Sequence, residues 1–286
     1  MGQIHGITVH ALSVGGLETC LDLPGHGVAI DQGRAMASTV SRDTVLYTHA
    51  HIDHMGAAAS HCATRSLMGL APPRYAVPAE DVDAFHGLLD AWRRLDRSPL
   101  ACTVVPASPG TALPLAHGRT ARAFRALHRV PTLGWSLWEP RKRLAPAWAG
   151  APAAEVRAAR RRGDVVDAVT THPVFAYTGD TLIDVVEREA VVREATVLYL
   201  ECTFLDARVS VASARDKGHV HLDEVIEREA IFANEAVVFC HLSARYRPEE
   251  AREILAARLP PALRAKAWVQ PNDRLASPAL RVGASA

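Results

Sequence analysis

The segment His49-Ala50-His51-Ile52-Asp53-His54 constrains this chain more than any other part of its sequence. It closely follows the apolar, β-branched run at residues 44–47, which predicts a strand, so the polar cluster stands at a strand end. Three histidines and one aspartate are not expected this close together in a hydrophobic core, because burying each of them without a polar partner would cost free energy. Imidazole and carboxylate are zinc ligands, and a turn can direct His49 and His51 at one ion while Asp53 and His54 face a second. The segment therefore predicts a metal centre, and a structural hydrogen-bond cluster is the less favoured alternative.

Further residues of metal-ligand type stand at the ends of other predicted strands. His128 follows the apolar run at 123–127, Asp180 follows residues 175–177 through Thr178-Gly179, and His241 follows residues 237–240. Sheets in α/β proteins usually build sites from side chains that strand ends deliver to one rim. Each of these residues alone is more often structural. The ordered set, together with the first segment, indicates one shared site.

Short β-branched runs alternate with stretches of helical periodicity, which is the pattern of an α/β protein. The predicted strands cover residues 7–12, 28–31, 44–47, 101–105, 174–177, 197–200 and 236–239. The predicted helices cover residues 80–95, 153–162, 183–194, 222–233 and 248–259. No linker divides the chain, so we expect one domain over residues 1–270, with an exposed excursion at 140–152 and a mobile tail at 271–286.

The composition sets weaker limits. A formal net charge of +1 neither indicates nor excludes a nucleic-acid partner. The five cysteines are scattered and never spaced as C-x-x-C, which favours reduced, buried thiols over a disulfide framework. No apolar run is long enough to span a membrane, and residues 1–13 lack the charged start of a signal peptide. We therefore expect a soluble, cytoplasmic protein.

The ordered ligand pattern resembles the metallo-β-lactamase superfamily, and additional motifs resemble ribonuclease Z more narrowly. The superfamily pattern is H-x-H-x-D-H, then one histidine, then Gly-Asp-Thr, then a late histidine. The narrower resemblance rests on Gly134-Trp135, Tyr177-Thr178-Gly179-Asp180-Thr181, Glu201-Cys202-Thr203-Phe204-Leu205-Asp206, Gly218-His219-Val220-His221 and His241-Leu242-Ser243-Ala244-Arg245-Tyr246. It covers roughly residues 12–270 and is closest to the short form found in plants and some bacteria. It implies an αβ/βα sandwich with two mixed β-sheets flanked by helices.

Ribonuclease Z removes 3′ trailers from precursor transfer RNA, so the resemblance implies a metal-dependent endoribonuclease with this substrate. It implies a homodimer in which one subunit holds RNA for the other, and two zinc ions per subunit, with manganese or iron as alternative metals. One ion would be bound by His49, His51 and His128. The other would be bound by Asp53, His54 and His241, with Asp180 as the bridge between the ions. Asp53 would also orient or deprotonate the attacking water.

The resemblance implies further roles outside the ligand set. His219 matches the proton donor that would protonate the departing 3′ oxygen, and Glu201 matches the carboxylate that holds this histidine cationic. Ser243, Arg245 and Tyr246 fall in a motif that implies contacts with the substrate. The role of His221 stays open, with a contribution to the first turn of the following helix as one alternative.

The family's long arm, which clamps transfer RNA, would lie between His128 and Asp180, and this interval is short here. Its basic side chains either contact phosphates or form a solvated basic face; they are Arg141, Lys142, Arg143, Arg157, Arg160, Arg161 and Arg162. The short interval and the neutral charge leave a second hypothesis open, in which the same metals hydrolyse cyclic nucleotides or other small phosphodiesters. The pair of His219 and Glu201 favours RNA, whose leaving group needs protonation.

Overall fold

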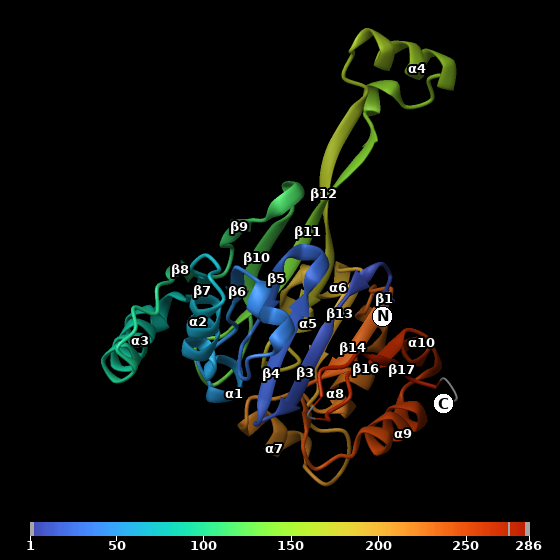
Figure 1. The fold of residues 1–286 in the computed structure, drawn as a ribbon. Helices are drawn as coiled ribbons and strands as arrows, with labels where there is room; N and C mark the ends of the chain where they lie inside the picture. The colour runs from blue at the N-terminus through green and yellow to red at the C-terminus, as the bar shows by residue number, and fades with distance from the viewer. Residues whose placement is uncertain (1–2, 274, 284–286) are drawn as a thin grey trace.

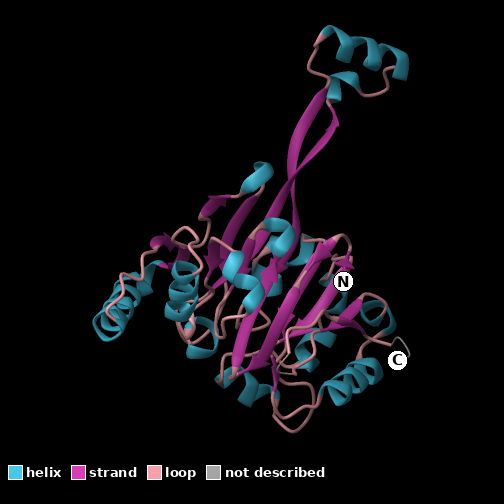
Figure 2. Cartoon of the chain, in the orientation of Figure 1, coloured by secondary structure: helices cyan, strands magenta, loops and turns pink. Residues whose placement is uncertain are grey.

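The computed structural model describes residues 3–273 and 275–283, which form two mixed β-sheets packed face to face with helices on their outer faces (Figures 1 and 2). In spatial order, the larger sheet consists of β17 (Leu280–Arg281), β16 (Ala267–Val269), β14 (Ala236–Cys240), β13 (Val197–Glu201), β12 (Asp167–Tyr177), β11 (Leu133–Leu144), β10 (Thr120–Arg125) and β9 (Ala112–Pro114). The smaller sheet consists of β15 (Leu242–Ser243), β3 (His10–Gly15), β4 (Glu18–Leu23), β5 (Val28–Ile30), β6 (Thr44–Leu46), β7 (Arg74–Pro78) and β8 (Thr103–Ala107). A hairpin of β1 (Gln3–Ile4) and β2 (Ile7–Thr8) precedes it.

The helices connect the strands and cover the sheets. They are α1 (Ile52–Met55), α2 (Ala58–Leu67), α3 (Val82–Asp96), α4 (Ala153–Arg162), α5 (Val185–Arg188), α6 (Ala190–Glu194), α7 (Val211–Asp216), α8 (Leu222–Ile226), α9 (Pro248–Arg258) and α10 (Pro261–Arg264). Apolar side chains of α2 and α3 pack on the smaller sheet, and those of α5, α6, α8, α9 and α10 pack on the larger. The predicted αβ/βα sandwich is confirmed. No helix in the described part of the chain has both the length and the apolar composition to cross a membrane.

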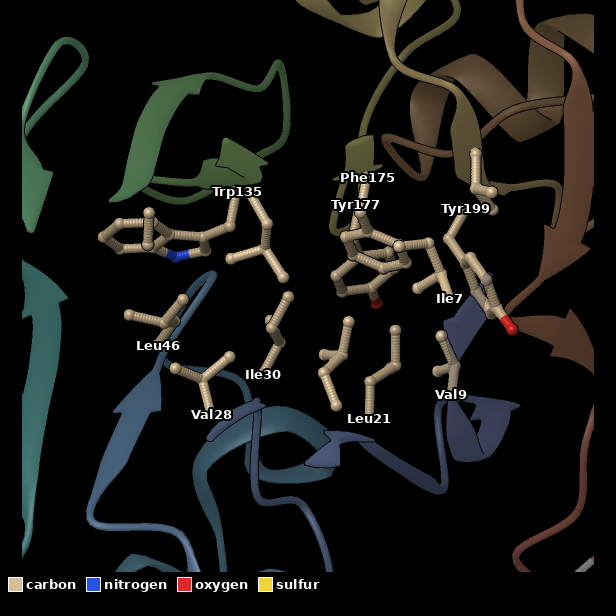
Figure 3. Packing of buried hydrophobic residues seen from close by; sticks show 14 of the residues in the cluster. Ile7, Val9, Leu21, Val28, Ile30, Leu46, Trp135, Phe175, Tyr177 and Tyr199 are labelled. Atoms are coloured by element: carbon tan, nitrogen blue, oxygen red, sulfur yellow. The ribbon is translucent and has the colours of Figure 1, made fainter. Parts of the chain in front are cut away.

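The central core lies between the two sheets (Figure 3). Trp135 and Tyr177 of the larger sheet pack in this layer with Leu21 and Ile30 of the smaller sheet, and all four side chains are fully buried. Side chains alternate along a strand, so each sheet directs one face into this layer and its other face toward the helices. The indole Nε1 of Trp135 donates to the carbonyl of Tyr47 at 2.9 Å, which satisfies its polar edge inside the core.

Parallel strands determine where the functional residues lie. β12, β13 and β14 run parallel to one another, as do β5, β6 and β7. Carboxyl ends of parallel strands meet at one edge of a sheet, so the residues that follow them lie close together. The polar segments that the sequence analysis singled out follow β6, β10, β12 and β14.

Two predicted helices are shorter than their periodicity indicated. The stretch 183–194 is divided at Glu189, whose backbone is extended (φ −107°, ψ 105°), into α5 and α6. The stretch 222–233 leaves the α-helical form after Ile226 and has a 3-10 turn at Glu229–Ile231. Packing, more than spacing of apolar residues, decides where short helices end. The helix predicted at 153–162 is confirmed at those bounds as α4.

Strands β11 and β12 extend beyond the sheet as a two-stranded arm that carries α4 at its tip (Figure 1). Their pairing reaches Leu144, opposite Asp167. A small hydrophobic cluster around Val156 holds the tip together. The exposed excursion predicted at 140–152 is therefore part of this arm. A short sequence interval is sufficient for a projecting arm because an extended strand rises about 3.3 Å per residue.

The described residues of the predicted tail pack against the domain. Ser277 forms a backbone bridge with Ala11, and Leu280 pairs with Val269 of β16. Leu280–Arg281 therefore forms an edge strand of the larger sheet, whereas the lack of periodicity predicted a mobile tail. Residues 274 and 284–286 of that tail lie outside the described residues. The domain boundary near residue 270 stays a prediction.

Candidate metal centre

Loops from both sheets converge on one site. His51 is the N-cap of α1, and φ of His241 is +55°, an unfavourable conformation that the surrounding structure must hold. The His241 N–H donates to Ser13 Oγ at 2.9 Å, which ties the late histidine to the smaller sheet. The structure brings together every ligand predicted from the sequence: His49, His51, Asp53, His54, His128, Asp180 and His241.

One group of ligand atoms belongs to His49, His51, His128 and Asp180, which each offer an atom within 4.8 Å of the others. The Nε2 atoms of His49 and His128 lie 3.7 Å and 3.9 Å from Oδ2 of Asp180. His128 Nε2 is buried and has no hydrogen-bond partner among the described residues. Because an unpaired buried nitrogen costs free energy, a metal ion at this point would stabilise it. Three imidazoles and a carboxylate fit a zinc ion.

A second group belongs to Asp53, His54 and His241. Oδ2 of Asp53 lies 3.6 Å from Nε2 of both histidines. Oδ1 of Asp180 lies 3.3 Å from Nε2 of His54 and 3.4 Å from Nε2 of His241. Asp180 therefore faces the first group with one carboxylate oxygen and this group with the other. A carboxylate between two sets of ligands is the arrangement that a pair of divalent ions requires.

The electrostatics of the site favour a bound cation. Burial holds the pKa of His49 well below its usual value, so its imidazole is neutral and able to bind a metal. Burial opposes ionisation of Asp180, but His241 and His54 outweigh it and hold the pKa of this carboxyl well below its usual range. Burial also opposes a charge on His54, yet Asp180 and Asp31 outweigh it and raise the pKa of that imidazole. The same carboxylates attract a divalent cation.

Histidine nitrogens that face away from the site are held by the protein. His54 Nδ1 hydrogen-bonds Oδ2 of Asp31 at 2.8 Å, and His128 Nδ1 donates to the carbonyl of Gly218 at 2.8 Å. Contacts of this kind orient the ring and leave Nε2 for the metal. Asp31 is fully buried just after β5 and also accepts from the Thr48 N–H at 2.7 Å. The sequence analysis did not identify Asp31 as functional; an acid that ends an apolar strand is the signal that could have found it.

Replacing Asp31 by Asn should weaken zinc binding by about 10–100-fold, because the neutral amide no longer polarises and orients His54. Competition with a chromophoric chelator measures the affinity. Asp43→Asn, which changes an exposed acid just before β6, should leave the affinity unchanged. An equal loss in both variants would contradict the proposed role of Asp31.

Gly33 packs directly against the turn that carries two of the ligands. A Cβ atom on Gly33 would lie 1.8 Å from the carbonyl oxygen of Asp53, and the neighbouring Gln32 N–H donates to the carbonyl of His54 at 2.7 Å. Only glycine allows this close approach of two backbone segments.

Gly33→Ala should therefore lower the free energy of unfolding by about 2 kcal/mol or more and displace the ligand turn. Thermal unfolding and zinc titration measure the two effects. Gly87→Ala in α3, where a Cβ has no neighbour within 4 Å, should instead raise the stability by up to about 1 kcal/mol. Similar melting temperatures for the two variants would show that the close backbone contact at Gly33 does not contribute to the stability of the fold.

His219 lies beside both ligand groups and is held by Glu201. Its Nδ1 is 3.0 Å from Oε1 of Glu201 and 3.9 Å from Oδ2 of Asp180. Glu201 is fully buried at the end of β13 and also accepts the N–H of Val220 at 3.2 Å. Burial lowers the pKa of His219, but the Glu201 carboxylate outweighs this effect and raises it. A cationic histidine beside a metal centre is suited to donate a proton.

His221 and Tyr246 both accept hydrogen bonds from backbone N–H groups. His221 is the N-cap of α8, and its Nδ1 accepts a backbone N–H of that helix at 3.1 Å, which confirms the first-turn alternative. Tyr246 is buried, and its hydroxyl accepts the N–H of Leu205 at 2.8 Å, so it holds the loop after β13. Ser243 is half-buried and Arg245 is exposed. Contacts of these two residues and of Tyr246 with substrate stay a prediction.

The fold and the site together define a metal-dependent hydrolase of the metallo-β-lactamase fold. The metallo-β-lactamase fold protein YhfI of Bacillus subtilis superposes with a TM-score of 0.62 at 13% identity, over 93% of this chain and 97% of that protein. The human short-form tRNase Z superposes with a TM-score of 0.57 at 18% identity, over 83% of this chain and 93% of its own. These likenesses establish the fold.

Sequence similarity establishes the family. A tRNase Z of Arabidopsis thaliana is 34% identical over 262 residues, which are 91% of this chain and 93% of the relative. The chloroplastic tRNase Z of the same plant is 30% identical over 88% of this chain and 72% of its own. No protein-family model matches the chain. The chain belongs to the ribonuclease Z family, which makes it an endoribonuclease.

Proposed function

We propose that this chain hydrolyses the phosphodiester at the 3′ trailer junction of precursor transfer RNA and leaves a 3′ hydroxyl on the transfer RNA. The Arabidopsis relatives that support the family assignment are named tRNase Z. The observation that carries the proposal is that His219, held by Glu201, lies beside two groups of metal ligands that share Asp180. A ribose 3′ oxygen is a poor leaving group, so its departure requires a proton donor in this position.

The cofactor we propose is a pair of zinc ions. His49, His51 and His128 would hold one ion and Asp53, His54 and His241 the other, with Asp180 contacting both. Bound there, zinc would lower the pKa of a water molecule and offset negative charge on the attacked phosphate. The predominance of imidazole ligands favours zinc over magnesium or calcium, which prefer oxygen.

Two side chains of the site are placed to move protons. The side chain of Asp53 is 14% exposed, so water reaches a carboxylate that would orient the nucleophile and accept its proton. The side chain of His219 is 16% exposed, and because its Nδ1 faces Glu201, Nε2 is the atom that would protonate the departing oxygen.

The arm is the surface that we propose contacts the RNA. Arg141, Lys142 and Arg143 are exposed on β11, and the arginines of α4 add further charge at the tip. The arm leaves the larger sheet at the end opposite to α1, which carries two of the metal ligands (Figure 1). This separation supports a homodimer in which the arm of one subunit holds RNA that the other subunit cuts.

Replacing Arg141, Lys142 and Arg143 together by Gln should weaken precursor binding and lower the slope of log affinity against log salt by about 3, because each phosphate contact releases about one counterion. Filter binding at several salt concentrations measures the slope. Hydrolysis of bis(p-nitrophenyl) phosphate should not change, since the arm is remote from the centre. Arg94→Gln, an exposed change on α3, serves as the control and should leave the slope unaltered.

The function is tested with a labelled precursor transfer RNA and the zinc-loaded protein, beside Asp53→Ala and a chromogenic phosphodiester. A single cut at the trailer junction that is absent from the variant would support the proposal. Turnover of the small diester without any RNA cleavage would overturn it, and would favour a phosphodiesterase for small substrates with the same centre.

A further inference from the structure

A threonine hydroxyl lies between Glu201 and the candidate ligand His241. Thr203 is buried two residues after Glu201, which ends β13. Its Oγ1 donates to Oε2 of Glu201 at 3.0 Å, and the same oxygen lies 3.1 Å from Nδ1 of His241. The hydroxyl therefore connects a buried carboxylate to the ring nitrogen of a ligand in the second group.

The first group of ligands has the same arrangement at Thr48. The Oγ1 of this buried threonine donates to Oδ2 of Asp31 at 2.8 Å and lies 3.0 Å from Nδ1 of His49. His54 Nδ1 is further from this oxygen, at 3.4 Å, and bonds Asp31 directly. Each ligand group thus contains one histidine that reaches a buried carboxylate through a threonine.

The donors and acceptors around Thr203 determine where the proton of His241 lies. The oxygens of Glu201 accept backbone N–H groups of Thr181, Val220 and Thr203, which stabilises the ionised carboxylate. An ionised carboxylate only accepts hydrogen bonds, and a hydroxyl has one proton to donate. The Thr203 proton therefore points to Glu201, and the hydroxyl oxygen accepts the Nδ1–H of His241.

The same reasoning applies to Thr48. The Asp31 carboxylate accepts both the N–H and the hydroxyl of this threonine, so the hydroxyl oxygen accepts the Nδ1–H of His49. A neutral imidazole with its proton on Nδ1 has its lone pair on Nε2. The Nε2 atoms of His49 and His241 lie 3.7 Å and 3.4 Å from the carboxylate of Asp180, where the two ligand groups meet.

We propose that Thr48 and Thr203 are positioning residues that hold His49 and His241 in the tautomer that binds zinc through Nε2. The inference rests on the proposed zinc centre and identifies hydroxyls that prepare it. Without the hydroxyl, a proton on Nδ1 would be buried with no acceptor, which costs free energy and disfavours this tautomer. Part of the binding energy of the metal would then be spent on restoring it.

The experiment compares valine with serine at each threonine, because valine keeps the shape and serine keeps the hydroxyl. We expect Thr48→Val and Thr203→Val each to weaken zinc binding by about 10–100-fold, measured by competition with a chromophoric chelator. Thr48→Ser and Thr203→Ser should remain close to the wild type. Thr44→Val is the matched control and should leave the affinity unchanged. Thr44 is also buried, and its hydroxyl donates to the Asp43 carboxylate at 2.9 Å at the other end of β6.

The order of the affinities tests the proposal. Serine variants that lose zinc while valine variants retain it would show that the threonines act through packing, and would overturn the inference. Equal affinities in all variants would overturn it as well. A wild type that binds no zinc would instead overturn the proposed centre, and this inference with it.

The tautomers can also be measured directly in the wild type. Long-range proton–nitrogen correlation spectra of the zinc-loaded protein report which ring nitrogen carries the proton. We expect the proton on Nδ1 of both His49 and His241. A proton on Nε2 of either ring would contradict the proposal, and this measurement does not depend on the folding of any variant.

Discussion

Replacing Asp180 by Asn should slow cleavage of both precursor transfer RNA and bis(p-nitrophenyl) phosphate by at least about a thousandfold, or about 4 kcal/mol of transition-state stabilisation. Its two oxygens lie 3.3–3.9 Å from imidazole nitrogens of both ligand groups, so the substitution removes the negative charge that the groups share. We also expect less bound zinc, measured by metal analysis after gel filtration.

The matched control for this substitution is Asp184→Asn, four residues further along the same loop. Asp184 pairs with Arg215 at 2.8 Å in a partly exposed ion pair, which contributes little to stability. Both reactions should therefore stay within about twofold of the wild type. If Asp180→Asn retained its zinc and its activity, the carboxylate would not bridge the two groups, and the proposed centre would be wrong.

Replacing His219 by Ala should slow RNA cleavage by about 10²–10⁴-fold, which is the usual contribution of a general acid. The same variant should hydrolyse bis(p-nitrophenyl) phosphate at nearly the wild-type rate, because p-nitrophenolate departs without protonation. Single-turnover rates with both substrates at saturating zinc measure the difference. The comparison is informative because damage to the metal centre would slow both reactions.

Equal losses for the two substrates would therefore show that His219 acts through the metal ligands and not on the leaving group. The structure gives this alternative a physical basis, because Nδ1 of His219 also lies 3.9 Å from Oδ2 of Asp180, one of the candidate metal ligands. Glu201→Gln is a less selective test, because its carboxylate accepts backbone N–H groups of Thr181 and Thr203 as well. We expect that variant to lose stability in addition to activity.

Much of the site could be predicted because its determinants are local in the chain. His49 and His51 stand in a short loop after an apolar strand, and His128, Asp180 and His241 each follow another strand. Residue type and position after a strand are both visible in the sequence. Parallel strands then bring such positions to one edge, as the distances around Asp180 confirm.

Other features depend on contacts that no local pattern encodes. Tyr246 falls in a motif typical of the family, and only the structure shows that it is buried and that its hydroxyl accepts the N–H of Leu205. The interval that contains α4 looked too short for an arm, and two paired strands extend it into one. The edge strand at Leu280 depends on β16, which offers a partner only after the sheet has formed.

The sequence by itself determined the set of candidate ligands, the α/β class and the family, because each depends on residue identity and spacing along the chain. Only the tertiary structure decided which other side chains orient those residues and which backbone segments pack against them. Asp31 orients His54 across 23 positions, and Gly33 contacts the backbone of Asp53. These contacts join residues from separate elements, and the packing of sheets and helices alone determines which of them become neighbours.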